Sequence, residues 1–461
     1  MKKISRLGII ADDLTGANDT GAQFARHGLA TVVSLDAVGD ECLFRAADVI
    51  VVNTDSRWST PDAAYSRAAI AAEFLKAVGV QYVYKKVDSA LRGNIGTEID
   101  AVMDVYDRKV AFVAPAFPAN GRITVNGRQL LRDKPLSETE MAADPLSPVT
   151  ESHVPTLLAS QSRRCIGHVS MDTVSMGASA LRDAFDSMVS LGKEIIVVDA
   201  VTDEDLCNMS QAISTLDYAF LAVGSAGLAA ELPVSLTLAP HVSQTVRRNA
   251  RSRVVVVNGS MSSVARDQVE HASRSLNLEI IRIDVDSILG HPDGNGLQQY
   301  VRQALARLGD GYDIALCLRS GATSGQVAAS DEESDTGRTE SSRRIARYLG
   351  SAVCEILRLQ SPLGLVLTGG DTALAVCSSL EACGIALSGE IMPGVPVGHL
   401  IDGLEPGLTV VTKAGSFGEI DTISRAIQYL HAVAMSSTCE RLGGERLGAR
   451  WQPASDTDYY G

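Results

Sequence analysis

The sequence predicts an α/β protein with two domains, each a mostly parallel sheet flanked by helices. The chain has 461 residues, which is more than one hydrophobic core usually serves. Hydrophobic residues make up 45% of the chain, aromatic residues only 5%, and 40 residues are glycine, as is typical of aliphatic strands joined to helices by tight turns. Short β-branched runs also alternate with helix-length amphipathic stretches, which is the order found in βαβ units.

The first half begins with a strand at Leu7 to Ala11 and a helix near 15 to 27, followed by a strand at Val49 to Asn53 and a helix near 61 to 78. Further strands are expected at Tyr82 to Val87, Lys109 to Ala114, Ile195 to Asp199 and Phe220 to Gly224. Because helices alternate with these strands, the sheet should be mostly parallel. Between Pro115 and Pro155 the periodic pattern is lost, and stretches of that length are usually functional or disordered.

An interdomain linker is expected at residues 233–252, which contain two prolines and few periodic apolar positions. The same stretch carries a basic cluster of Arg247, Arg248 and Arg251. The domains are then 1–232 and 253–435, with a flexible tail at 436–461. Strands of a second sheet are expected at Val254 to Val257 and near 279–284, 313–318, 364–368 and 409–412. The polar run Ser330 to Arg344 is expected to form an exposed loop.

Charge and residue spacing exclude several classes of protein. A formal net charge of −14 argues against nucleic acid as a partner, because binding to a phosphate backbone needs a basic face. The chain shows no secretory signal pattern, and no apolar run approaches the roughly 18 residues of a membrane helix. The eight cysteines form no CxxC pair, and the eight histidines have no metal-binding spacing. We therefore expect a cytoplasmic protein without a membrane partner or a structural zinc.

Two adjacent acids, Asp12 and Asp13, follow the first strand where a helix should begin. Ligands bind at this carboxyl edge of open parallel sheets. Either acid can accept a hydroxyl proton, hold a sugar hydroxyl or face a metal, and either can instead cap the helix. Two adjacent acids are rarely both caps, and Asp13 is the better candidate for the cap. Asp12 is therefore the stronger functional candidate.

The strand expected at Tyr82 to Val87 runs into a glycine-rich turn that carries Asp88 and Arg92. Because strand residues alternate faces, Lys86 and Asp88 point to one side and Lys85 to the other. A cation that faces a cleft neutralises a carboxylate, and arginine does so with two parallel hydrogen bonds. We expect Lys85 to form a solvated salt bridge of little consequence. Arg57, which follows an earlier strand, can join Lys86 at the same sheet edge.

Three strand ends in the second half run into glycine turns. They are Asn258-Gly259-Ser260, Thr368-Gly369-Gly370-Asp371-Thr372 and Lys413-Ala414-Gly415-Ser416. Glycine lets backbone amides approach an oxyanion, and the N-terminus of a following helix adds a favourable dipole. One such turn is common and Asp371 can be a simple cap, but three turns on one sheet edge indicate a nucleotide site. Neither a GxxxxGK[ST] P-loop nor a GxGxxG dinucleotide motif occurs.

Taken together, these strings resemble the four-carbon acid sugar kinase family. The matching segments run in order across nearly the whole chain: Ile10 to Gly21, Lys85 to Gly96, Pro115 to Arg122, Asp144 to Ser152, Gly224 to Leu228, Thr368 to Ala373 and Lys413 to Gly418. The resemblance implies an N-terminal sugar-acid domain, a C-terminal nucleotide domain and an active site in the cleft between them. The string Asp88 to Asn94 is similar to the branch that acts on D-threonate and D-erythronate.

The resemblance also implies an activity: ATP phosphorylates the terminal hydroxyl of a four-carbon acid. D-threonate is the first candidate, and D-erythronate or a 3-oxo-tetronate is the alternative. The implied cofactors are ATP and Mg²⁺, and self-association is left open. Carried over by motif, the acid-binding positions are Asp12, Arg57, Lys86, Asp88 and Arg92, and the nucleotide-binding positions are Ser260, Gly369, Gly370, Asp371, Thr372 and Gly415.

The identity of the catalytic acid stays open between Asp12 and Asp371. Phosphoryl transfer depends on in-line positioning, charge neutralisation and usually Mg²⁺. We expect the cations of the first half to fix the carboxylate end of the acid, so that its far hydroxyl points across the cleft, and we expect the domains to close over it. Rival hypotheses are a non-catalytic sensor of both ligands, an oxidoreductase on hydroxy acids, which the missing GxGxxG motif disfavours, and a glycerate-type kinase.

Overall fold

The computed structural model describes residues 6–36, 44, 47–143, 148–236, 253–290, 296–319 and 335–439. The main-sheet strands of the first half are β1 (Leu7–Ala11), β2 (Thr31–Ser34), β3 (Val49–Asn53), β4 (Tyr82–Lys86), β5 (Ala111–Ala114), β9 (Ile166–Val169), β10 (Ile195–Val198) and β11 (Leu221–Gly224). Those of the second half are β12 (Val254–Asn258), β13 (Leu278–Asp284), β14 (Asp313–Arg319), β15 (Gly364–Thr368), β16 (Gly384–Met392), β17 (Val395–Ile401) and β18 (Thr409–Lys413).

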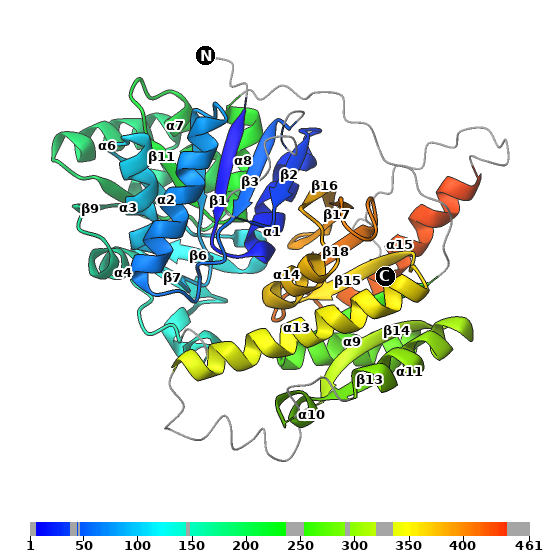
Figure 1. Cartoon of the computed structure of the whole chain (residues 1–461). Helices are drawn as coiled ribbons and strands as arrows, with labels where there is room; N and C mark the ends of the chain where they lie inside the picture. Colours follow the sequence, from blue (N-terminus) through cyan, green and yellow to red (C-terminus); the bar gives the residue numbers. More distant parts are fainter. Residues whose placement is uncertain are drawn as a thin grey trace, which may run out of the picture.

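Helices flank this sheet in both halves (Figure 1). In the first half they are α1 (Leu14–Ala25), α2 (Pro61–Ala77), α3 (Ile95–Tyr106), α4 (Val154–Gln161), α5 (Met171–Val174), α6 (Ala178–Ser190), α7 (Asp203–Ser214) and α8 (Ala226–Ser235). In the second half they are α9 (Ser263–Ser275), α10 (Val285–Gly290), α11 (Leu297–Gly309), α13 (Asp335–Leu359), α14 (Gly370–Ser379) and α15 (Thr422–Cys439). No helix in the described ranges combines the length and the apolar character that crossing a membrane requires.

The strands form one sheet in the order β13-β14-β12-β15-β18-β17-β16-β2-β3-β1-β4-β11-β5-β10-β9. Within this sheet, the first-half strands pair with one another only in parallel, and the pairings that join β13, β14, β12, β15 and β18 are also parallel. Antiparallel pairing within this sheet is confined to β16, β17 and their neighbours. The predicted α/β class with mostly parallel sheets is confirmed. The ladder between β2 and β16, which joins the two sheets into one, was not expected.

The strand pattern follows from burial on both faces. Successive residues of β1 enter opposite cores: Leu7 and Ile9 pack in one cluster, and Ile10 packs in the other. All five residues of β1, and likewise of β3, β12 and β15, are buried. Helices on both sides of a parallel sheet produce such continuous apolar strands. The β-branched runs were therefore strong signals, and the corresponding strands lie within one or two residues of the predicted ranges.

Helix α1 is the element at which the two halves meet. It packs against β2 and β3 of the first half and against α14, β16, β17 and β18 of the second half. Gly21 allows this approach, because a Cβ there would lie 2.6 Å from Leu387 Cδ1. Polar groups also cross the contact: Asn18 Nδ2 donates to Thr412 Oγ1 at 3.1 Å, and both residues are buried. The N-terminal end of α1 therefore lies against the second half.

The structure differs from the sequence analysis in four segments. The predicted loop Ser330 to Arg344 is wrong over 335–344, which form the start of α13. The first three residues of the expected linker, 233–235, complete α8, and 237–252, with its arginine cluster, lies outside the described residues. Residues 436–439 belong to α15, and 440–461 are likewise outside. The patternless stretch 115–155 contains the small antiparallel sheet of β6 (Arg122–Val125), β7 (Arg128–Leu131) and β8 (Lys134–Pro135).

The prediction for Lys85 is also wrong. Its ammonium lies 2.8 Å from Glu98 Oε2, and the two side chains are only 1% and 2% exposed. Lys85 Nζ also donates to the carbonyl of Lys86 at 2.6 Å, and Glu98 Oε1 accepts from Ser56 Oγ at 2.8 Å. Strand alternation correctly predicted that Lys85 points to the opposite face of the sheet from Lys86. It could not predict that α3 covers that face and supplies the carboxylate of Glu98.

Removing one partner of this pair should be far more damaging than replacing both. We predict that Lys85→Met lowers the free energy of unfolding by about 3–5 kcal/mol, because it leaves a buried carboxylate without a cation. Adding Glu98→Gln should recover most of that loss, and urea unfolding of both variants measures it. A loss under about 1 kcal/mol for Lys85→Met would instead indicate a pair as weak as a surface salt bridge.

Candidate active site

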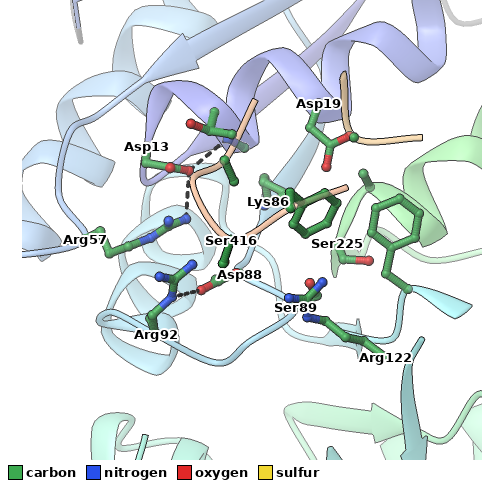
Figure 2. A pocket seen from close by; sticks show the side chains of 17 residues that line it. Asp13, Asp19, Arg57, Lys86, Asp88, Ser89, Arg92, Arg122, Ser225 and Ser416 are labelled. Carbon is green, nitrogen blue, oxygen red and sulfur yellow. Dashed lines mark hydrogen bonds and ion pairs between the residues drawn. The ribbon is translucent and has the colours of Figure 1, made fainter. Parts of the chain in front are cut away.

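A polar pocket opens where the carboxyl ends of β1 and β4 meet the second half (Figure 2). Residues of the first half make up most of its wall: Asp13, Thr15, Gly16, Asp19, Arg57, Lys86, Asp88, Ser89, Arg92, Phe117, Arg122, Ser225 and Ala226. The second half contributes Gly394, Ala414, Ser416 and Phe417. Charged side chains of both signs therefore surround one pocket between the halves.

Arg57 joins the two acids at the end of β1. Its Nε and Nη2 donate to Asp12 at 2.6 and 3.0 Å, and Nη2 also donates to Asp13 Oδ1 at 2.7 Å. Asp13 caps α1 by accepting from the Gly16 amide at 2.9 Å, so the cap is the acid that the sequence favoured. Asp12 is 4% exposed and does not line the pocket. Burial alone would raise the pKa of Asp12, but Arg57, with Lys85 and Lys86, holds it below its ordinary value.

The turn after β4 brings the other predicted acid-binding residues to the same wall. Arg92 Nε donates to Asp88 Oδ2 at 2.6 Å. Burial alone would raise the pKa of Asp88, but Arg92, Arg57 and Lys86 together lower it well below its ordinary value. Leu91 adopts a left-handed backbone with φ of 61°, which is costly for a bulky side chain and is typical of functional turns. The turn thereby presents Arg92 to the pocket.

Lys86 occupies the middle of this wall and is only 5% exposed. Its ammonium lies close to α1, because a Cβ on Gly16 would be 2.7 Å from Nζ. Within the described residues no hydrogen bond or ion pair engages this ammonium, whereas Arg57 and Arg92 both bind carboxylates. Lys86 is therefore the cation best placed to bind an anionic ligand.

The hairpin of β6 and β7, within residues 115–155, forms one side of the pocket through Arg122. Gln129 Nε2 donates to the Ser89 carbonyl at 2.9 Å, which fastens the hairpin to the turn after β4. Asp199 accepts from the amides of Asn126 and Gly127 at 2.7 and 2.8 Å and holds the tip of the hairpin. At its base the Arg122 guanidinium lies 4.9 Å from the centre of the Phe417 ring. A cation–π contact of this kind links the two halves across the pocket.

The three glycine turns of the second half lie together, since β12, β15 and β18 are neighbours in the sheet. A Cβ on Gly415 would lie 2.1 Å from Ser260 Oγ, and one on Gly259 would lie 2.0 Å from Thr372 Oγ1. Gly369 has φ of 100° and precedes α14, so Gly370, Asp371 and Thr372 form the first turn of that helix. The predicted nucleotide-binding residues are thus brought into one group.

This group also touches the first half. A Cβ on Gly370 would lie 3.0 Å from Thr15 Oγ1 and 3.1 Å from Asp13 Oδ2. Burial raises the pKa of Asp371, and the carboxylates of Asp55 and Asp13 raise it further against the opposing charge of Arg57. Burial also lowers the pKa of Lys413, at the end of β18, to about 7. The described residues contain no cluster of three or more His, Cys, Asp or Glu side chains that could hold a metal ion.

Several residues that line the pocket were not assigned a role from sequence. Asp19, Arg122, Ser225, Ser416 and Phe417 all lay inside quoted motifs. Asp19 had a usable signal, because it follows Thr15 by four residues and so lies on the same face of α1. Arg122 had none, since nothing local shows that the hairpin folds back over the pocket.

Comparison with known proteins gives a consistent result. The model of a sugar-binding N-terminal domain matches residues 7–232, and that of a nucleotide-binding C-terminal domain matches residues 255–423. A D-threonate kinase of Salmonella typhimurium is 37% identical over 92% of this chain and 97% of its own length. A D-erythronate kinase of Heliobacterium modesticaldum is 32% identical over 93% of this chain and 97% of its own.

A solved structure described as a putative tRNA synthase from Salmonella typhimurium has the same fold. It aligns with a TM-score of 0.75 and 24% identity over 92% of this chain and 100% of its own. The two domain matches and the near full-length relatives show that this chain belongs to the four-carbon acid sugar kinase family.

Proposed function

We propose that this protein uses ATP to phosphorylate the terminal hydroxyl of a four-carbon sugar acid, with D-threonate as the preferred substrate. The observation that carries the proposal is the contact between Gly370 of the nucleotide-binding turns and Asp13 and Thr15 of the acid-side wall. That contact brings a turn of the kind that binds phosphate to the edge of the pocket that Lys86 lines. ATP and the acid bound at these two places would be close enough for phosphoryl transfer.

The acid is expected to bind with its carboxylate towards the cationic turn. Lys86 offers an ammonium that the described residues leave without a hydrogen-bond partner, and Arg92 and Arg57 add positive charge beside it. Arg57 is already committed to Asp12 and Asp13. We therefore assign Asp12 the role of orienting Arg57, because a buried carboxylate with a lowered pKa is a poor proton acceptor.

Mg²⁺ fits beside the pocket, at the first turn of α14. This ion usually binds through one or two carboxylates together with substrate phosphates, so a cluster of three protein ligands is not required. Asp371 is the carboxylate that would hold it, because Asp371 lies in the first turn of α14 and is buried near Asp55 and Asp13, whose repulsion a cation would relieve. When bound, the ion would neutralise charge on the phosphates.

The direct test is ADP release with D-threonate, L-threonate, D-erythronate, 3-oxo-tetronates and D-glycerate, each with and without Mg²⁺. We expect Mg²⁺-dependent turnover that is fastest with D-threonate. Faster turnover of D-erythronate or of a 3-oxo-tetronate would change the substrate but keep the reaction. If no four-carbon acid is turned over although acid and nucleotide both bind, the protein is a sensor rather than a kinase.

The acid-side assignment predicts the effect of Lys86→Met. Loss of a charged hydrogen bond is worth about 1.5–3 kcal/mol, so KM for the acid should rise roughly 10- to 100-fold. The affinity for ATP, measured by calorimetry, should change little. Lys109→Met is the matched control, since Lys109 is 84% exposed on the surface. An unchanged KM for Lys86→Met would remove Lys86 from the acid site.

The nucleotide-side assignment predicts the effect of Gly415→Ala. The new methyl would lie 2.1 Å from Ser260 Oγ, which accepts from the Ser262 amide, so the two turns must move apart. We expect ATP affinity to fall at least tenfold, equal to about 1.4 kcal/mol, in a titration. Gly309→Ala is the control, because a Cβ at Gly309 meets no atom within 4 Å. Equal ATP affinity in both variants would place the nucleotide elsewhere.

A further inference from the structure

We propose that Asp19 accepts the proton of the substrate's terminal hydroxyl during phosphoryl transfer. This role rests on the proposed function and names the group that performs its proton-transfer step. Asp19 lies one turn after Thr15 on α1 and lines the pocket. Figure 2 shows its side chain among the pocket residues, at the upper right of the labelled group, with Arg92 at the lower left. An acid whose carboxylate binds at the arginine end would direct its far hydroxyl towards Asp19.

The hydrogen bonding of Asp19 sets it apart from the other carboxylates nearby. Its Oδ1 is buried and has no hydrogen-bond partner among the described residues. Buried polar atoms are nearly always paired, so an unpaired carboxylate oxygen at a pocket wall indicates a missing ligand donor. A substrate hydroxyl is a donor of the required kind.

Each of the remaining acids of the pocket binds an arginine through at least one of its oxygens. Asp13 binds Arg57 and caps α1, and Asp88 binds Arg92. Asp12 is held by two hydrogen bonds from Arg57 and does not line the pocket. Asp371 does not line it either. Among the carboxylates that line this pocket in the described residues, Asp19 is the one with a buried oxygen that lacks a hydrogen-bond partner. Oδ2 of Asp13 also accepts no hydrogen bond there, but it lies at the contact with Gly370.

The surroundings of Asp19 suit a proton acceptor at neutral pH. Burial raises its pKa to about 7, and the charges of Glu390 on β16 and Asp13 at the start of α1 act in the same direction. Lys86 at the end of β4 and Arg122 on β6 oppose this rise. Glu390 is itself held by Gln23 Nε2 at 3.0 Å and by Arg26. A base works best when its pKa is near the working pH, where it is partly ionised and still basic.

The reaction step balances without a further reagent. The hydroxyl oxygen of the acid forms a bond to the γ-phosphorus of ATP as the bond from that phosphorus to the β,γ-bridging oxygen breaks, and ADP leaves with that electron pair. The hydroxyl proton passes to the ionised carboxylate of Asp19. The protonated carboxyl then returns the proton to solvent, and Arg122, whose charge acts on Asp19, lines the same pocket.

The test is Asp19→Asn, assayed with D-threonate and ATP over pH 5.5–9. For the wild type we expect kcat to fall as the pH drops through about 7, because protonation removes the base. Asp19→Asn should lower kcat by roughly 10²- to 10⁴-fold and abolish that acid limb, with less than about threefold change in KM for the acid or in ADP affinity. Asp183→Asn, an exposed change on α6, is the matched control and should keep wild-type kinetics.

A second variant keeps the test decisive if Asp19→Asn does not fold. Glu390→Gln removes one of the charges that raise the pKa of Asp19, so the acid limb should move to lower pH. An acid limb that stays in place in Glu390→Gln, or a folded Asp19→Asn that keeps a tenth or more of kcat, would overturn the role of Asp19 alone. If the wild type turns over no four-carbon acid, the proposed function falls and this role falls with it.

Discussion

The ladder between β2 and β16 is the constraint on which the arrangement of the protein depends. It joins two parallel blocks into one sheet, and the three antiparallel pairings around β16 and β17 make the strands of the second block run opposite to those of the first. In a flat sheet the carboxyl ends of the two blocks would lie at opposite edges. Figure 1 shows the blocks turned relative to each other, and β16 carries register shifts at Leu387/Gly389 and Glu390/Met392, where bulges increase strand twist.

Helix α1 brings the polar pocket to the contact between the two halves. It begins at the carboxyl end of β1 and packs against α14 and β16, so its N-terminal turn belongs to both halves. The backbone of α14 comes so close to α1 at this point that little room is left for a side chain. The residue opposite Thr15 is accordingly a glycine, Gly370. Ion pairs hold the charged side chains of the pocket's first-half wall in position, since Arg57 and Arg92 each bind a carboxylate. Preorganised charge of this kind stabilises an anionic transition state without further rearrangement.

The features that could be predicted from the sequence are those that depend on short stretches of neighbouring residues. Parallel strands buried on both faces appear as β-branched runs, and Lys86, Asp88 and Arg92 reach the pocket because a strand end positions them directly. Strands β16 and β17 were missed because glycine and proline interrupt their pattern, and the pairing of β16 with β2 spans some 350 residues of sequence. Asp12 shows the same limit, because the pairing of β1 with β3 is what brings Arg57 to it. The spacing of Asp19 from Thr15 gave its face of α1, and the packing of α1 shows that this face lines the pocket.

The central claim is that one pocket between the halves binds the acid and the γ-phosphate together. A crystal structure with D-threonate and a non-hydrolysable ATP analogue tests it most directly. The account predicts the carboxylate of the acid beside Lys86 and Arg92, its terminal hydroxyl within hydrogen-bonding distance of Asp19, and the phosphates over Gly369, Gly370 and Gly415. An acid bound in the reverse direction, or a nucleotide whose phosphates lie away from these turns, would contradict it.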